Sequence, residues 1–107
     1  LTLGENIADL GGVLIAYDAL QAHLKQHRRK NRDGLTPEQR FFLGFAQQER
    51  DIRRKELEKT SALNDPHSPS EFRINGPLAH MPGFYETYGV KKGDALYREE
   101  RMRSRIW

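Results

Sequence analysis

Apolar residues recur at helical spacing through the first 26 residues of the chain. They occupy positions 7, 10, 14, 17, 20 and 24, a spacing that places them on one side of an α-helix. Val13 and Ile15 add apolar side chains on the flanks. A helix that is apolar nearly all round is typical of a protein interior. We therefore predict a helix over about residues 3–26 that is buried on most of its surface.

A second helix is indicated by a clear start signal. Thr36 is placed as its N-cap, Pro37 as its first residue, and Gln39 as the residue that completes a capping box. Three aromatic residues and an alanine form its core face: Phe41, Phe42, Phe45 and Ala46. Residues 47–59 are nearly all polar, so we expect a solvated extension of this helix that frays.

The rest of the chain contains only short segments of regular pattern. Residues 70–74 fit either a helix or an extended segment, and Asn75-Gly76-Pro77 predicts a turn. A helix is expected over residues 82–88, with a proline at its first position. Trp107, in a polar tail, suggests docking into a groove of the core. Because strand patterns are scarce, we predict a mainly α protein that forms a single unit over residues 1–107.

Composition adds one reservation to this picture. Charged residues make up 31% of the 107 residues, which is polar for a small domain that must bury its own core. The strongly apolar first helix does not fit that polarity, so we expect part of its cover to come from sequence outside the chain. No apolar run approaches the ~20 residues of a membrane span, and no signal peptide is visible. Cysteine is absent, which excludes disulfides and thiolate zinc sites.

Two carboxylates stand out on the first helix. Glu5 and Asp9 are four residues apart and therefore share one helix face. Unpaired charge on a buried helix costs several kcal/mol, and a metal cation is one partner that would offset this cost. Two simpler readings remain open at this point. Thr2 and Glu5 fit a capping box, which spacing alone favours, and Asp9 fits an ion pair with an arginine or lysine.

A second group of polar residues surrounds a histidine between two prolines. A histidine titrates at about pH 6.5 and can move a proton or stabilise an anion. Asp65 is placed to orient the ring of His67 by hydrogen bonding, and Arg73 offers a cationic fork of donors. On chemistry alone, a loop histidine of this kind is more often structural than catalytic.

Both groups lie in blocks that resemble one protein family. Residues 1–12, LTLGENIADLGG, are similar to the Glu-x-x-x-Asp block of the neprilysin and endothelin-converting-enzyme family of zinc metallopeptidases. His-Ser-Pro at 67–69, Phe-Arg at 72–73 and Met-Pro-x-Phe at 81–84 resemble the C-terminal signature of that family. Residues 41–47 and the closing Arg-Ile-Trp also match, so the likeness covers essentially the whole chain in order.

The resemblance implies a role for each of the five polar residues. Glu5 would be the third zinc ligand, and Asp9 would support a zinc-bound histidine or donate a proton. His67 would stabilise the oxyanion of the tetrahedral intermediate, and Asp65 would orient it. Arg73 would bind a backbone carbonyl of the substrate. The implied fold is the helical C-terminal portion of a thermolysin-like zinc peptidase domain.

The sequence departs from the family pattern at a few places. Arg50, Val90 and Ser104 replace cysteines of the animal members, which fits a bacterial-type member. Gln48-Glu49 replaces the Val-Trp of the family, and His80 replaces an asparagine. None of these changes falls on the five residues with implied roles.

The His-Glu-x-x-His motif that binds zinc in this family is absent from the sequence. His23 and His27 have the same spacing, but Leu24 occupies the position of the glutamate base, and we interpret them as surface residues at a helix end. We therefore expect the C-terminal portion of a zinc endopeptidase or oligopeptidase that acts on peptides. One zinc ion would serve the full-length enzyme, the remainder of the same polypeptide would complete the site, and residues 1–107 alone would be inactive.

Two other classes of function remain as alternatives. The basic clusters at residues 25–32 and 50–59 would suit a small nucleic-acid-binding module, although the second is interleaved with acids and lacks stacking aromatics. For this reason we expect no nucleic-acid partner. A helical interaction module that self-associates through exposed apolar helix surface is the other alternative. The compartment stays open between an extracytoplasmic and a bacterial cytoplasmic location.

Overall fold

The computed structural model describes residues 2–50, 56, 59–60 and 64–106. Its elements are α1 (Leu3–Gln26), α2 (Pro37–Gln48), α4 (Ser70–Leu78), α5 (Pro82–Tyr88) and a 3₁₀ turn, η1 (Glu100–Met102). No strand occurs among these described residues apart from one isolated bridge between Arg32 and Leu35. The prediction of a mainly α protein is confirmed.

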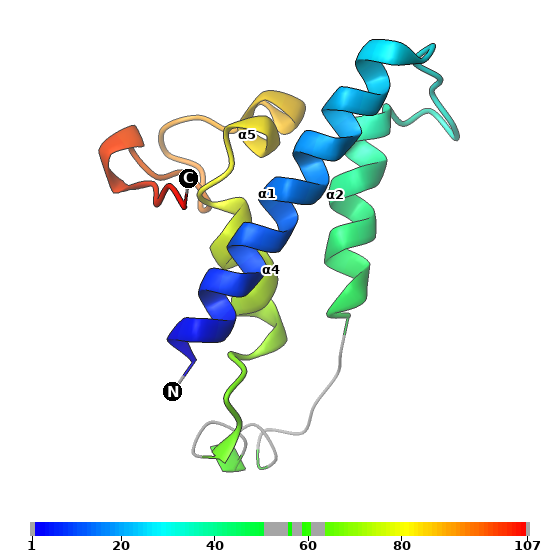
Figure 1. Ribbon diagram of the computed structural model, residues 1–107. Coiled ribbons are helices and arrows are strands. Elements are labelled where there is room, and N and C mark those ends of the chain that lie inside the picture. Colours follow the sequence, from blue (N-terminus) through cyan, green and yellow to red (C-terminus); the bar gives the residue numbers. More distant parts are fainter. Residues whose placement is uncertain (1, 51–55, 57–58, 61–63, 107) are drawn as a thin grey trace.

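The helices are arranged around the long α1. In Figure 1, α2 runs alongside α1, α4 crosses behind it, and α5 lies above α4, near the tail. The contacts between α1 and α4 are the most extensive, and α2 packs against both α1 and α5. No described helix is long and apolar enough to cross a membrane.

Phe42 is the centre of the core. It is almost fully buried together with Val13, Leu78 and Met81, so residues from α1, α2 and the end of α4 meet there. Its ring stacks on Tyr17 at a centroid distance of 5.1 Å and meets Phe84 edge-on at 5.4 Å. Aromatic pairs of this geometry add about 0.5–1.5 kcal/mol each beyond the burial of their area.

The start of α2 forms as its sequence predicts. The Gln39 backbone N–H donates to Thr36 Oγ1 at 3.2 Å, and the Thr36 N–H donates to Gln39 Oε1 at 2.9 Å. The end of α2 differs from the prediction, because the helix stops at Gln48 and residues 49–50 are not helical. Residues 47–50 are all polar, so no apolar side chain there holds the chain in a continuous helix. Residues 56, 59 and 60 are helical again, and 51–55 and 57–58 lie outside the described residues.

The predicted turn at Asn75-Gly76-Pro77 is wrong, because these residues form the last turns of α4. Pro77 and Leu78 are buried there, and this tertiary burial outweighs the local preference for a turn. Residues 70–74, which fit either a helix or an extended segment, are helical because they form the first part of α4. The prediction for 82–88 is confirmed: α5 spans Pro82–Tyr88, and Gly89 follows as its C-cap with a φ of 66°, which suits glycine.

The tail after α5 folds back on the helices. The hydroxyl of Tyr85 lies 2.7 Å from the Ala79 carbonyl oxygen and 2.9 Å from that of Leu96, and it accepts the N–H of Arg98 at 2.7 Å. Further along, the backbone N–H of Ser104 donates to His80 Nδ1 at 2.9 Å. The predicted docking of Trp107 lies outside the described residues.

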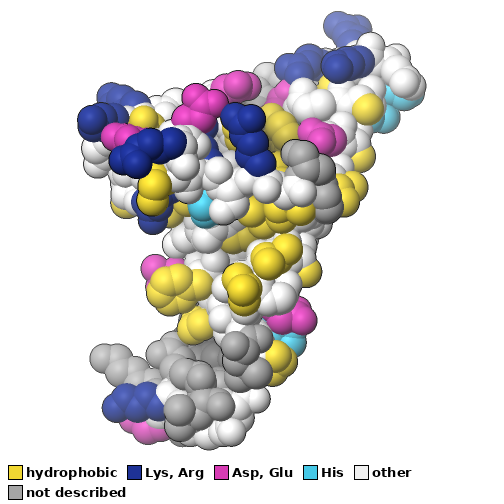
Figure 2. All heavy atoms as spheres, turned by 60° about the vertical axis from the view of Figure 1, so that its left-hand side comes forward, with side chains coloured by type: hydrophobic (Ala, Val, Ile, Leu, Met, Phe, Trp, Pro, Cys, Tyr) yellow, Lys and Arg dark blue, Asp and Glu magenta, His cyan; other side chains and the backbone are white. Residues whose placement is uncertain are grey.

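The prediction that α1 is buried on most of its surface is wrong for this chain. Leu10, Gly11 and Val13 are buried against the other helices, whereas Leu3, Ile7 and Ile15 are half or more exposed. Figure 2 shows exposed hydrophobic side chains gathered on one face of the molecule. The described helices cover one side of α1 only, in keeping with the expectation that its cover is incomplete within this chain.

Candidate active site

Glu5 takes no part in capping α1, which was one of the readings open for it. Thr2 is the N-cap of α1, but its side chain makes no capping hydrogen bond, so the capping-box reading is wrong. The Glu5 carboxylate instead lies 3.3 Å from Nε2 of His67, and both side chains are 44% exposed. The loop before α4 therefore supplies the partner of Glu5, which no local pattern in the first helix indicates.

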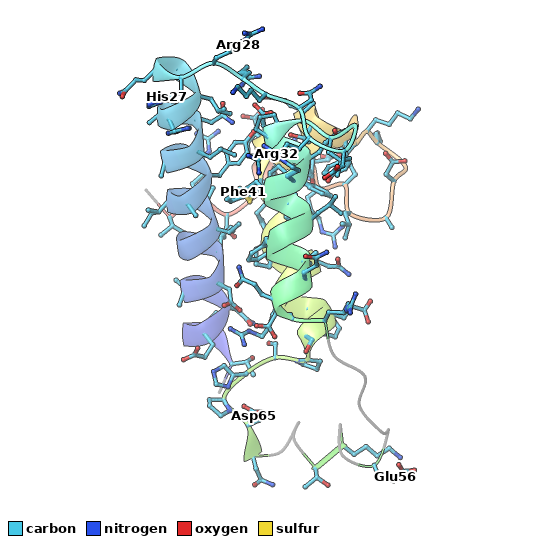
Figure 3. All side chains as sticks on the ribbon, turned by 90° about the vertical axis from the view of Figure 1, so that its right-hand side faces the viewer. His27, Arg28, Arg32, Phe41, Glu56 and Asp65 are labelled. Atoms are coloured by element: carbon cyan, nitrogen blue, oxygen red, sulfur yellow. The ribbon has the colours of Figure 1, made fainter. Side chains whose placement is uncertain are left out.

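His67 is held between two carboxylates. Its Nδ1 lies 2.8 Å from Asp65 Oδ1, and its backbone N–H donates to the same oxygen at 2.9 Å. Asp65 therefore fixes both the loop and the ring, as its spacing predicts. Figure 3 shows Asp65 just below the N-terminal end of α1. A further bond ties the loop to α1, because Ser68 Oγ donates to Asn6 Oδ1 at 2.8 Å.

One helical turn further along α1, Asp9 binds Arg73. Nε and Nη2 of Arg73 each donate to a different Asp9 oxygen at 2.8 Å, which is the paired geometry that arginine and carboxylate favour. Of the readings open for Asp9, the ion pair with an arginine is the one the structure contains. The pair is largely shielded from water, with side-chain exposures of 22% for Arg73 and 18% for Asp9.

Arg73 has a second acidic partner. Its Nη1 lies 3.1 Å from Oε1 of Glu49, the residue that follows the last turn of α2. Hydrogen bonding to Asp9 raises the pKa of the Arg73 guanidinium above its usual value; burial opposes this, and the charges of Asp9, Glu49 and Glu5 raise the pKa further. The guanidinium is therefore a permanent cation that joins α1, α2 and α4.

Sequence reasoning gave no role to Glu49 or to the Asn6 and Ser68 pair, although all three belong to this site. Glu49 lies in a stretch where acids and bases alternate, so no spacing distinguishes it from residues on a solvated surface. Asn6 is adjacent to Glu5 within the Glu-x-x-x-Asp block, but its role as an anchor for Ser68 depends on a contact across 62 residues. Only the packing of α2, α4 and the loop before α4 around α1 brings these groups together.

The site contains two adjacent pairs of oppositely charged or polar side chains, which differ in their exposure to water. The Glu5 and His67 pair is half-exposed, so both side chains are accessible to a ligand. The Asp9 and Arg73 pair beside it is more buried and supplies a fixed positive charge. Among the described residues, no three histidine or acidic side chains are grouped to hold a metal ion. A catalytic zinc site uses three protein ligands, so a zinc site that included Glu5 would need further ligands from elsewhere.

Comparison with known proteins shows which family the chain resembles. Residues 1–104 match the model of peptidase family M13. The chain is 39% identical over 109 residues to endothelin-converting enzyme 1 of Cavia porcellus and 37% identical over 106 residues to neprilysin-1 of Caenorhabditis elegans. These alignments cover 99% and 94% of this chain and 14% of each relative, so the chain spans about one seventh of their length.

The fold agrees with solved structures of a bacterial relative. The zinc metalloprotease Zmp1 of Mycobacterium tuberculosis superposes with a TM-score of 0.93 in its open state and 0.94 in complex with an inhibitor. In both cases the sequence identity is 43%, and the match covers 99% of this chain and 16% of the other. The expected likeness to the neprilysin and endothelin-converting-enzyme family is thereby confirmed, and the chain belongs to peptidase family M13.

Proposed function

We propose that the natural protein containing this chain is a zinc-dependent peptidase that hydrolyses peptide bonds. We further propose that Glu5, His67 and Arg73 lie in its active site. The observation that carries the proposal is the arrangement along α1. An accessible Glu5 and His67 pair stands one turn from a shielded Asp9 and Arg73 pair, in a chain that matches family M13 from residue 1 to 104.

Glu5 is the residue that we assign to zinc. Its side chain is 44% exposed, and it lies in the first turn of α1. Zinc, when bound, polarises the scissile carbonyl and activates the attacking water. Because His-Glu-x-x-His is absent from residues 1–107, the two histidine ligands and the general base come from elsewhere in the polypeptide.

His67 is assigned to the oxyanion that forms when water attacks the carbonyl. Donation from Nε2 to the oxyanion, while Nδ1–H donates to Asp65, requires the imidazolium form with a proton on each nitrogen. Asp65 accepts from Nδ1 at 2.8 Å and so fixes the direction in which Nε2 points. A donor that is already oriented stabilises developing charge without reorganising, which is worth about 2.7–4 kcal/mol in comparable sites.

Arg73 is assigned to the backbone carbonyl of the peptide. A guanidinium has five N–H groups, of which two donate to Asp9 and one faces Glu49. The two remaining N–H groups, one on each terminal nitrogen, are available to a carbonyl oxygen. Asp9 holds the guanidinium in place and is therefore a positioning residue in this scheme.

The test compares zinc content and hydrolysis in the full-length protein. Glu5→Ala should lose bound zinc and cleavage of a quenched fluorescent peptide, whereas Glu71→Ala, an exposed acid on α4, should keep both. Chelation should abolish cleavage by the unaltered protein, and zinc should restore it. Chelator-resistant cleavage, or a Glu5→Ala protein with normal zinc content, would contradict the assignment.

The chain by itself provides a second test. Purified residues 1–107 supplied with zinc should not cleave the same peptide, because one protein ligand does not hold a catalytic zinc ion. Cleavage by this polypeptide that survives Glu5→Ala would mean that the chemistry resides elsewhere.

A further inference from the structure

We propose that Glu49 is a positioning residue for Arg73, and that it sets the orientation in which the guanidinium meets the substrate. This inference rests on the proposed role of Arg73 and extends it to a residue outside the matching motifs. Glu49 occupies the position at which the family pattern has a tryptophan. Tryptophan has no carboxylate and cannot accept a hydrogen bond from arginine in this way. The contact is therefore not part of the family pattern described above.

Glu49 reaches Arg73 from a different helix than Asp9 does. It is the C-cap of α2, and its carboxylate turns toward α4 with 27% of the side chain exposed. Its Oε1 lies 3.1 Å from Nη1, whereas both Asp9 contacts are made by Nε and Nη2. All three nitrogens of the guanidinium are therefore engaged, by carboxylates on two independent elements.

This division of contacts explains why a second acid matters. Two parallel bonds to Asp9 hold one edge of the guanidinium but leave its plane able to tilt about that edge. A third contact at Nη1, from an element fixed separately in the core, removes this freedom. A displacement of about 1 Å in a positioning group can lower the rate about 100-fold. Fixing the plane of the guanidinium therefore favours productive binding of the substrate.

The location of Glu49 permits a clean test. It follows the last residue of α2, where the Arg50 backbone N–H donates to the Gln47 carbonyl oxygen at 3.3 Å, so the local backbone bond does not involve the Glu49 side chain. Shortening the side chain therefore removes the carboxylate without disturbing the capping box or the aromatic core. Glutamine keeps an acceptor of the same length but not the charge, so Glu49→Ala and Glu49→Gln separate the two contributions.

The experiment measures kcat and KM for peptide hydrolysis by the full-length, zinc-loaded protein. Arg73 acts on substrate binding in this scheme, so Glu49→Ala should raise KM about 5-fold and change kcat less than about 2-fold. Glu49→Gln should fall between Glu49→Ala and the unaltered protein. Glu71→Ala serves as the matched control on the helix of Arg73 and should change neither constant.

A double-mutant cycle with Arg73→Ala shows whether Glu49 acts through Arg73. Once Arg73 is absent, removing Glu49 should have no further effect on KM. An unchanged or lowered KM in both Glu49 variants would overturn the inference, as would an equal rise in KM with and without Arg73. If Arg73→Ala itself leaves KM unchanged, the proposed role of Arg73 fails and this inference fails with it. If Arg73→Ala raises KM and the Glu49 variants do not, only the inference about Glu49 fails.

Discussion

Arg73 and Asp9 are joined by two hydrogen bonds of 2.8 Å each, across 64 residues of sequence. This pair ties α4 to α1 beside the accessible Glu5 and His67 pair. Because both side chains are mostly shielded from water, the loss of either partner leaves a charge in a poorly solvated position.

Asp9→Asn should therefore lower both stability and activity. Asparagine keeps the size of the side chain but removes the charge, so we expect a loss of about 1–3 kcal/mol in the free energy of unfolding. The midpoint of urea unfolding measures this loss, and Asp18→Asn, an exposed acid on the same helix, is the control. Equal midpoints for Asp9→Asn and Asp18→Asn would show that the pair does not stabilise the fold.

His67→Gln should impair the chemical step more than binding. Glutamine cannot provide the oriented imidazolium donor, so kcat should fall about 100- to 1,000-fold with KM little changed. Zinc content, measured on the same sample, should stay normal because His67 is not assigned as a ligand. The loss of an oxyanion donor changes kcat by far more than 2-fold. A kcat within 2-fold of that of the unaltered protein would therefore remove His67 from the mechanism.

Gly83→Ala should destabilise the packing of α5 on α1. A Cβ at this position would approach the Tyr17 ring to 2.6 Å at Cζ and 2.8 Å at the hydroxyl oxygen. The ring cannot easily move, because Phe41 and Phe42 pack against it at 5.4 and 5.1 Å between centroids. We expect a cost of about 1–3 kcal/mol in the free energy of unfolding.

Gly44→Ala is the matched control for this steric prediction. Gly44 lies inside α2, and a Cβ there would meet none of the described atoms within 4 Å. Alanine should stabilise the helix by about 0.5–1 kcal/mol because it restricts the unfolded chain. Thermal unfolding of both variants gives the comparison, and a Gly83→Ala protein as stable as Gly44→Ala would contradict the close contact.

The tail should loosen at acidic pH through His80. Burial, and then the charge of Arg98, lowers the pKa of His80, so the folded state favours the neutral ring. Its contribution to stability is therefore present above the ordinary histidine pKa of about 6.5, and it is lost as the pH falls through the lowered pKa. Protonation at Nδ1 also removes the acceptor for the Ser104 N–H.

Hydrogen exchange at the Ser104 amide is the measurement for this prediction. Protection, corrected for the intrinsic pH dependence of exchange, should fall as the pH is lowered below the ordinary histidine pKa of about 6.5. His80→Asn does not titrate in this range, so its protection should vary less with pH. An equal pH dependence in the two proteins would assign the effect to another group.

The sequence by itself determined the features that form between residues close together along the chain. The capping box of Thr36 and Gln39, the helix from Pro82 to Tyr88 and the placement of Asp65 on His67 all involve residues a few positions apart. Steric preference and short-range hydrogen bonding are sufficient for such features, and a pattern read along the chain captures them. The family likeness also lies in the sequence, because it depends on ordered blocks of residues.

Tertiary structure decided what depends on distant segments. Asn75-Gly76-Pro77 is helical because burial of Pro77 and Leu78 outweighs its turn preference, and Glu5 meets His67 instead of capping its own helix. Arg73 acquires Glu49 in addition to Asp9 because α1, α2 and α4 converge on its guanidinium. Such contacts form between groups that chain folding brings close, and charge pairing selects partners by distance in space rather than by spacing in sequence.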